Sequence, residues 1–134
     1  MYLLDTSALI ILLFGEVTNA KLSDASKDIL ENSDEIYLSE ISIWEIAIKI
    51  KIQKIDIKES ISGIVSKCAD YGINMIPVNV DQFEETVNLP LIKDHGDPFD
   101  RLIISVAKMN DLTIISTDSK MMQYKDEYGV RVLD

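Results

Sequence analysis

The chain has 134 residues, 47% of them hydrophobic and 27% charged, a composition and length typical of one globular domain, residues 1–134. No apolar run reaches the ~18 residues of a membrane span, and the apolar N-terminus carries Asp5 without a basic start, so we expect neither a membrane protein nor a signal peptide. The formal net charge of −10 argues against a basic nucleic-acid-binding face, and the single cysteine, Cys68, excludes an internal disulfide and suits a reducing cytoplasm.

Short apolar runs alternate with helical patterns along the chain. In chain order we predict a strand over residues 2–5, helices over 8–14 and 19–31, a strand over 36–39, helices over 41–52 and 59–71, a strand over 74–78, helices over 81–88 and 99–109, and strands over 113–117 and 130–133. Gly72 is expected to end a helix, and Pro77 favours an edge position for its strand.

The predicted strands are apolar throughout instead of at every second residue. Together with the alternation of strands and helices, this pattern indicates a parallel sheet that is covered on both faces. We therefore predict an α/β fold, a three-layer α/β/α domain around a central parallel sheet. In such folds, sites form at the carboxyl ends of the strands, where the following helices also begin.

Four acidic side chains are expected at that edge. Asp5 ends the first strand, Asp118 directly follows residues 113–117, and Asp100 lies in the first turn of a helix. Glu45 borders the apolar sector of its helix, where a carboxylate must reach solvent, pair with a cation or bind a metal. Carboxylates so close repel one another unless a cation lies among them, and oxygen ligands alone select Mg²⁺ or Mn²⁺. Such a site predicts phosphodiester hydrolysis, because its cations attract phosphates despite the acidic total.

Some of these acids also have an ordinary structural interpretation. Asp97, Pro98 and Asp100 match the N-cap, N1 and N3 positions of a helix, with Asp100 bonding back to the cap. Glu45 can pair with Lys49, one turn later on the same helix. The pattern favours capping for Asp97 and leaves both interpretations open for Asp100 and Glu45.

Hydroxyl groups flank the two acids that follow strands. They belong to Thr6, Ser7, Ser116 and Thr117. These groups can bond a carboxylate or a bound water, and they serve equally well in turns and helix caps. The sequence alone does not separate these roles.

Four further side chains carry weaker signals. His95, the only histidine, stands in a loop before a helix, where a structural or exposed role is commoner than a catalytic one. Arg101 is expected to pair with surface charges or with the acids, and whether either residue contacts substrate is left open. Trp44 and Ile48 lie on the apolar side of their helix and are expected in the core or in a dimer contact.

Four stretches of the sequence together resemble a known family. They are LLDTSALI, SIWEIAIK, HGDPFDRLIISVA and TIISTDSKM. In order and spacing they are similar to the PIN-domain ribonucleases, in particular the VapC-type toxins of type II toxin–antitoxin pairs. The resemblance covers essentially the whole chain, and its most specific part is DPFDR after a histidine with WEIAIK upstream.

The resemblance implies a Mg²⁺- or Mn²⁺-dependent endoribonuclease acting on RNA. It also implies a homodimer and a tight complex with a cognate VapB-like antitoxin, which alone contacts promoter DNA and whose basic tail can plug an acidic site. Carried over to this chain, the metal-binding and catalytic acids are Asp5, Glu45, Asp100 and Asp118. Asp97, Thr6 and Thr117 would support them, although relatives often carry arginine where this chain has Thr117.

Other classes fit the pattern less well. A haloacid-dehalogenase-like phosphatase would need a second aspartate two residues after Asp5, where the chain has Ser7. A receiver-like regulatory domain would need an acidic pair at the first strand and a phosphoacceptor aspartate after a middle strand, and neither pattern is present. The alternative that stays open is a non-catalytic, Mg²⁺-binding PIN-like interaction module.

Overall fold

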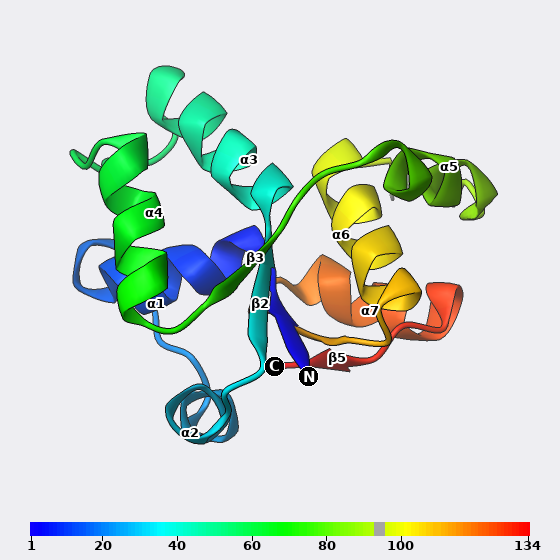
Figure 1. Ribbon diagram of the computed structural model, residues 1–134, viewed down its shortest axis with the longest axis horizontal. Coiled ribbons are helices and arrows are strands. Elements are labelled where there is room, and N and C mark those ends of the chain that lie inside the picture. Colours follow the sequence, from blue (N-terminus) through cyan, green and yellow to red (C-terminus); the bar gives the residue numbers. More distant parts are fainter. Residues whose placement is uncertain (93–95) are drawn as a thin grey trace.

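The central sheet has five parallel strands in the order β3-β2-β1-β4-β5 (Figure 1). The computed structural model describes residues 1–92 and 96–134, and its strands are β1 (Tyr2–Leu4), β2 (Ile36–Ser39), β3 (Asn74–Ile76), β4 (Thr113–Ile115) and β5 (Val132–Leu133). All pairings between these strands are parallel. The predicted parallel sheet is therefore confirmed, and so is the edge position of the strand before Pro77.

Helices cover both faces of the sheet (Figure 1). They are α1 (Thr6–Thr18), α2 (Asp24–Asn32), α3 (Glu40–Lys51), α4 (Ile61–Asp70), α5 (Val80–Asn88), α6 (Pro98–Met109) and α7 (Ser119–Tyr128). Buried residues of α1 to α4 form one apolar cluster, and buried residues of α6 and α7 form another on the opposite face. The three-layer α/β/α architecture is thereby confirmed. Within the described residues, no helix is long and apolar enough to cross a membrane.

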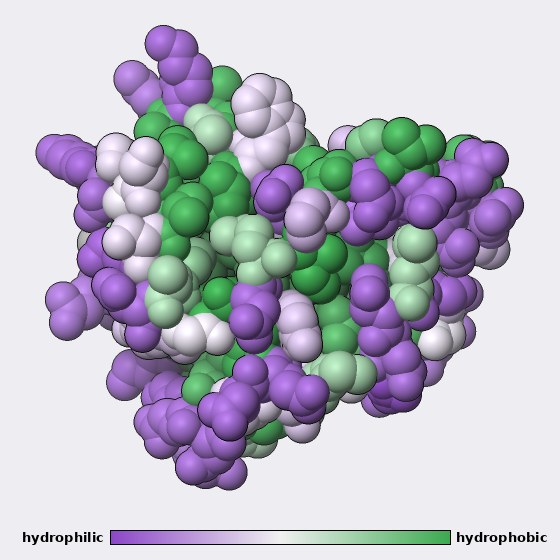
Figure 2. All heavy atoms as spheres, in the orientation of Figure 1, coloured by the Kyte–Doolittle hydropathy of each residue, from purple (hydrophilic) through white to green (hydrophobic). Residues whose placement is uncertain are grey.

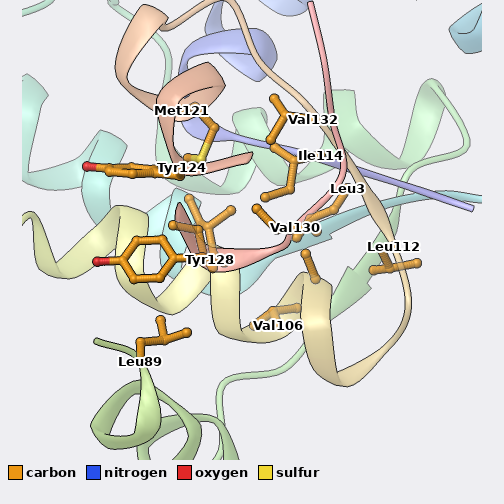
Figure 3. Packing of buried hydrophobic residues seen from close by; sticks show 13 residues of the cluster. Leu3, Leu89, Val106, Leu112, Ile114, Met121, Tyr124, Tyr128, Val130 and Val132 are labelled. Carbon is orange, nitrogen blue, oxygen red and sulfur yellow. The ribbon is translucent and has the colours of Figure 1, made fainter. Parts of the chain in front are cut away.

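The middle of the sheet explains why its strands are apolar throughout. Leu3 and Leu4 are neighbours in β1, both are fully buried, and they belong to the two opposite clusters. Successive side chains of a strand point to opposite faces, so a strand covered on both sides needs an apolar residue at every position. Figure 3 shows Leu3 packed with Ile114 beneath the aromatic rings of α7.

Several predicted boundaries differ from the structure, and two of the differences have a clear physical reason. The helix predicted to begin at residue 19 begins at Asp24, because Asn19 has a left-handed φ of 53° and Ser23 caps α2 by accepting the Ser26 amide at 3.1 Å. The strand predicted over residues 113–117 ends at Ile115, level with Leu4 of its neighbour β1. The chain leaves the sheet there, so the residues that follow are free to build a site.

Helix α7 is an element that the sequence analysis missed. Its residues are mostly polar, and only Met121, Tyr124 and Tyr128 are buried, at spacings of three and four residues. This narrow stripe is enough to hold a helix against β4 and α6, because the packing surface provides the stability that the composition lacks.

Candidate active site

Asp5 stands where β1 turns into α1, with 3% of its surface exposed. One carboxylate oxygen, Oδ1, accepts the Ala8 amide and the Ser7 hydroxyl, each at 2.8 Å, and the other accepts the hydroxyl of Ser116. Burial raises the pKa of Asp5, these bonds lower it, and the charge of Asp118 raises it further. The Asp5 carboxylate is thus held in one orientation by three donors of the chain.

Ser116 links Asp5 to the acid that follows β4. Its hydroxyl donates to Asp5, and its Oγ accepts the amide of Asp118 at 3.0 Å. Asp118 is in turn the N-cap of α7 and accepts the Lys120 amide at 2.9 Å. Two parallel strands that end at the same edge bring these acids together, as the sequence predicts.

Asp100 lies in the first turn of α6, and Asp97 is the N-cap that accepts the amides of Phe99 and Asp100 at 2.9 and 3.0 Å. Capping is therefore confirmed for Asp97. The bond expected from Asp100 back to the cap is not formed, and within the described residues nothing donates to the Asp100 carboxylate. Asp100 is left without the structural role that the helix pattern allowed.

The electrostatic surroundings of Asp100 identify its neighbours. Burial, and to a smaller extent the charges of nearby carboxylates, raise its pKa to about 7. In order of size, these charges belong to Asp97, Asp118, Asp5 and Glu45. All four acids predicted from the sequence therefore lie near one another at one edge of the sheet.

Glu45 of α3 is buried, with 8% of its surface exposed, and within the described residues only one of its two carboxylate oxygens has a partner. Oε2 pairs with Lys49 Nζ at 3.0 Å, as one interpretation of the sequence expected. Oε1 is fully buried and has no hydrogen-bond partner among the described residues. A buried carboxylate oxygen without a donor carries a large desolvation cost, and a cation among the acids would offset it.

A family model provides an independent view of the whole chain. The model of the PIN domain matches residues 2–127. The chain belongs to the PIN domain family. Among curated proteins, none matches its sequence.

Solved structures similar to this PIN domain come from bacterial complexes. A toxin–antitoxin complex from Klebsiella pneumoniae has a TM-score of 0.62 and 18% identity, covering 100% of this chain and 97% of that one. VapBC2 from Rickettsia felis, bound to a promoter DNA fragment, has a TM-score of 0.64 and 15% identity, covering 98% of this chain and 96% of that one. DNA-bound VapBC from Salmonella typhimurium has a TM-score of 0.67 and 15% identity, covering 99% of this chain and 96% of that one. At these identities the likeness establishes the shared fold.

The hydroxyl residues of the PIN domain divide into two groups. Ser7 and Ser116 contact Asp5 directly. Thr6 instead donates to Ser42 at 3.0 Å, a buried bond between α1 and α3, and Thr117 donates to Ser7 at 3.4 Å. Ser42 was not predicted, because nothing in the sequence places α3 against the start of α1.

The Arg101 side chain connects three helices through hydrogen bonds. Its guanidinium donates to the carbonyls of Thr86, Leu89 and Pro90 at 2.7 to 3.1 Å and to the Tyr128 hydroxyl at 3.2 Å. These bonds tie the end of α5 and the end of α7 to α6. Among residues 1–92 and 96–134, Arg101 forms no ion pair with the acids, and its guanidinium is bonded to neutral groups.

Two other predicted residues have different outcomes. Trp44 is 60% exposed, so of its two expected places the core is wrong and the dimer contact stays a prediction, whereas Ile48 of the same helix is half-buried. His95 lies outside the described residues. The exposure of Trp44 follows from the position of α3, which buries Ser42, Glu45 and Ile46 and turns the indole outward.

The carboxylate group of the PIN domain matches the ligands of a hard divalent cation. It offers oxygen ligands without histidine or cysteine, the set that suits Mg²⁺ or Mn²⁺. Within residues 1–92 and 96–134, nothing donates to Glu45 Oε1 or to the Asp100 carboxylate, and no three such side chains stand in an arrangement ready to hold a metal ion. The ligand chemistry therefore fits such a cation, and the acids would have to move closer together to bind one.

Proposed function

We propose that this PIN domain is a metal-dependent endoribonuclease, the toxin of a type II toxin–antitoxin pair, that hydrolyses phosphodiester bonds of RNA (tRNA, rRNA or mRNA). The observation that carries the proposal is the buried Glu45 Oε1, an unpartnered carboxylate oxygen beside three aspartates that follow strands or open a helix. Membership of the PIN family supports the reaction, and structural likeness to toxin–antitoxin complexes supports the biological setting.

In this proposal Asp5, Glu45, Asp100 and Asp118 hold Mg²⁺, with Mn²⁺ as a substitute. Bound there, the cation would polarise the phosphate, lower the pKa of an attacking water and neutralise the leaving oxygen. Its binding would also offset the burial and the repulsion that together raise the pKa of Asp100 to about 7. The carboxylates that repel one another in the metal-free chain would thus be the groups that bind the catalytic cation.

The chain's own residues would position these ligands. Ser7, Ser116 and the Ala8 amide fix the Asp5 carboxylate, so that it does not rotate when substrate or metal leaves. Asp97 orients the first turn of α6 and adds a negative charge beside Asp100. Lys49 places a positive charge beside the buried Glu45 and would move toward solvent or phosphate when a cation replaces it.

The proposed partners are RNA, a cognate VapB-like antitoxin and a second copy of the chain. Promoter DNA would be contacted only through the antitoxin; the similar VapBC structures from Rickettsia felis and Salmonella typhimurium are both DNA-bound complexes. The homodimer is supported by the outer face of α5 and the segment after it, where Val80, Val87 and Leu91 are 73%, 78% and 85% exposed. We place this one-domain protein, residues 1–134, in the cytoplasm.

The test is cleavage of a total-RNA and tRNA pool by the purified chain, wild type beside Asp5→Asn. Discrete fragments are expected with Mg²⁺ or Mn²⁺, and none with EDTA or with the variant. Intact RNA in every lane, from folded protein freed of antitoxin, would contradict the proposal.

A second candidate is a non-catalytic, Mg²⁺-binding PIN-like interaction module. It is favoured by the Lys49–Glu45 ion pair, because the lysine already supplies the positive charge that one ligand needs. Tight antitoxin binding and Mg²⁺ binding by a wild-type chain that leaves all RNA intact would be its signature.

A further inference from the structure

An open pocket lies beside the candidate acids, between α3, α5 and α6. Its volume is about 500 Å³, and its walls include Ile41, Trp44, Phe83, Pro98, Phe99 and Leu102. Figure 2 shows the outline of the surface dipping between α3 and α5, next to the hydrophobic surface over α5. The pocket is too large to be left by imperfect packing and is open to solvent.

The aromatic walls of this pocket are unusually exposed. Trp44 is 60% and Phe83 is 49% exposed, although aromatic side chains dominate the energetics of buried contacts. They approach from two helices that are distant in the sequence, α3 and α5. Exposed aromatic side chains that gather around a hollow mark a binding site more often than a defect of the core.

The pocket and the acids share two helices. Trp44 directly precedes Glu45 in α3, and Phe99 directly precedes Asp100 in α6. Adjacent residues of a helix differ by ~1.5 Å along the axis and ~100° around it, so each aromatic group lies beside its acid but faces a neighbouring direction. A ligand that fills the pocket would therefore lie directly next to the group of carboxylates.

Charge restricts what that ligand can be. The chain carries a net charge of −10, Asp97 and Asp100 flank the wall residues Pro98 and Phe99 in the sequence, and Glu45 follows Trp44, so phosphates are repelled except where a cation binds them. Among the described lining residues the charged side chain is Arg101, whose guanidinium is already bonded to three backbone carbonyls and a hydroxyl. The face of a nucleobase is neutral and planar, and bases stack on exposed aromatic side chains whatever their sequence. A ribonuclease with this charge would have to gain affinity for its strand from bases more than from phosphates.

We propose that this pocket binds an unpaired nucleobase of the RNA strand next to the scissile phosphate, with the base stacked on Trp44 and Phe83. The proposal rests on the proposed function in taking RNA as the substrate, and it adds the positioning contact. It makes cleavage specific for single-stranded RNA, because a paired base cannot leave its helix to enter a pocket without the cost of unstacking.

The chain provides its own probe, since Trp44 is the only tryptophan. We would titrate the Asp5→Asn protein in Mg²⁺ with an unpaired ten-nucleotide RNA and with the same strand carrying abasic residues. Stacking is expected to quench the Trp44 fluorescence with the normal strand and to leave it unchanged with the abasic one. Equal responses to both strands, or no response to either, would overturn the proposal.

Kinetics of otherwise wild-type variants provide the second measurement. Trp44→Ala is expected to raise KM for single-stranded RNA ~10-fold with little change in kcat, and Trp44→Phe to restore most of the loss, because a stacked base contributes about this much. Tyr71→Ala is the matched control, since Tyr71 is an aromatic side chain that is 56% exposed at the end of α4 and lies outside the pocket. Circular dichroism would establish that each variant is folded.

The outcomes separate this proposal from the proposed function. RNA cleavage with an unchanged KM for Trp44→Ala overturns the nucleobase pocket and leaves the nuclease intact. Quenching by the normal strand without any cleavage supports the pocket and contradicts the nuclease. A Trp44 signal that changes with protein concentration, with a matching dimer in sedimentation and no response to RNA, would identify the pocket as a contact between copies and overturn the proposal.

Discussion

Asp5 and Asp100 lie near each other in the same group of acids, but the chain satisfies their carboxylates in opposite ways. Asp5 receives three hydrogen bonds, from Ser7, Ala8 and Ser116. Asp100 receives none within the described residues and is surrounded by four other carboxylates that raise its pKa further. The fold alone positions the Asp5 carboxylate, whereas the Asp100 carboxylate is buried among like charges that a cation would offset. One candidate site thus combines an acid that the chain itself orients with an acid whose charge a bound cation would stabilise.

The largest expected effect is on activity and is shared by both acids. Asp5→Asn and Asp100→Asn should each lower kcat/KM for RNA by at least ~100-fold, because each removes a negative charge from a site that has to hold a cation. The two variants should differ in stability. Asp100→Asn should raise Tm because it relieves repulsion between carboxylates, and Asp5→Asn should lower Tm because it disturbs hydrogen bonds from three donors. Cleavage assays beside thermal unfolding without metal would measure this, and equal shifts in Tm would contradict the contrast.

Metal and pH should both act through Asp100, in addition to any effect through Asp5, whose pKa is also raised. Its pKa of about 7 in the folded chain exceeds its ordinary value of 3.8, so between these values the folded state retains a proton that the unfolded chain has released. The metal-free protein should therefore lose stability as pH rises from about 4 to about 7. Urea unfolding at several pH values would test this, and Asp100→Asn, which cannot ionise, should flatten the slope.

Mg²⁺ should reverse the loss at neutral pH. At a concentration 100 times its Kd, a ligand that binds only the folded state adds about 2.7 kcal/mol to the free energy of unfolding. Unfolding at pH 7.5 with Mg²⁺ and then with EDTA would measure the gain. A gain that persists in Asp100→Asn would show that the cation does not need Asp100.

Arg101, the neighbour of Asp100 in the chain, should affect stability and not chemistry. Arg101→Met leaves the carbonyls of Thr86 and Leu89 without their donors and should lower the free energy of unfolding by about 2 kcal/mol. Arg131→Met is the control, because its surface pair with Asp111 is worth at most about 1 kcal/mol. Activity per folded molecule should stay unchanged in both, as denaturant titration and RNA cleavage would establish.

The smallest expected effect concerns the hydrogen bond from Ser116 to Asp5. Ser116→Ala removes the donor to one Asp5 oxygen and should cost about 1 kcal/mol of stability and about 10-fold in activity, because the carboxylate is less firmly oriented. Ser105→Ala is the matched control, since that buried hydroxyl donates only to the Arg101 carbonyl of its own helix. Equal activity of the two variants would mean that Asp5 does not need Ser116.

Much of the fold follows from local patterns. The strand over Ile36–Ser39 and the helix after it are predicted almost to the residue, because a covered parallel strand must be apolar at every position and a helix cap must be a hydroxyl or acid. Helix α7 was missed because only three of its positions are buried, and that stripe is visible only once α6 and β4 are in place.

The sequence by itself determined which acids end strands or open helices, and therefore that Asp5, Asp100 and Asp118 share one edge. The tertiary structure alone decided that Ser116 bonds Asp5 across 111 positions, that Glu45 keeps one oxygen without a donor, and that Trp44 is exposed beside a pocket. The two kinds of information differ in the separation along the chain over which they act. Periodicity and capping report what a residue does within its own helix or strand, whereas the partners of a side chain depend on which distant elements the sheet brings to the same edge.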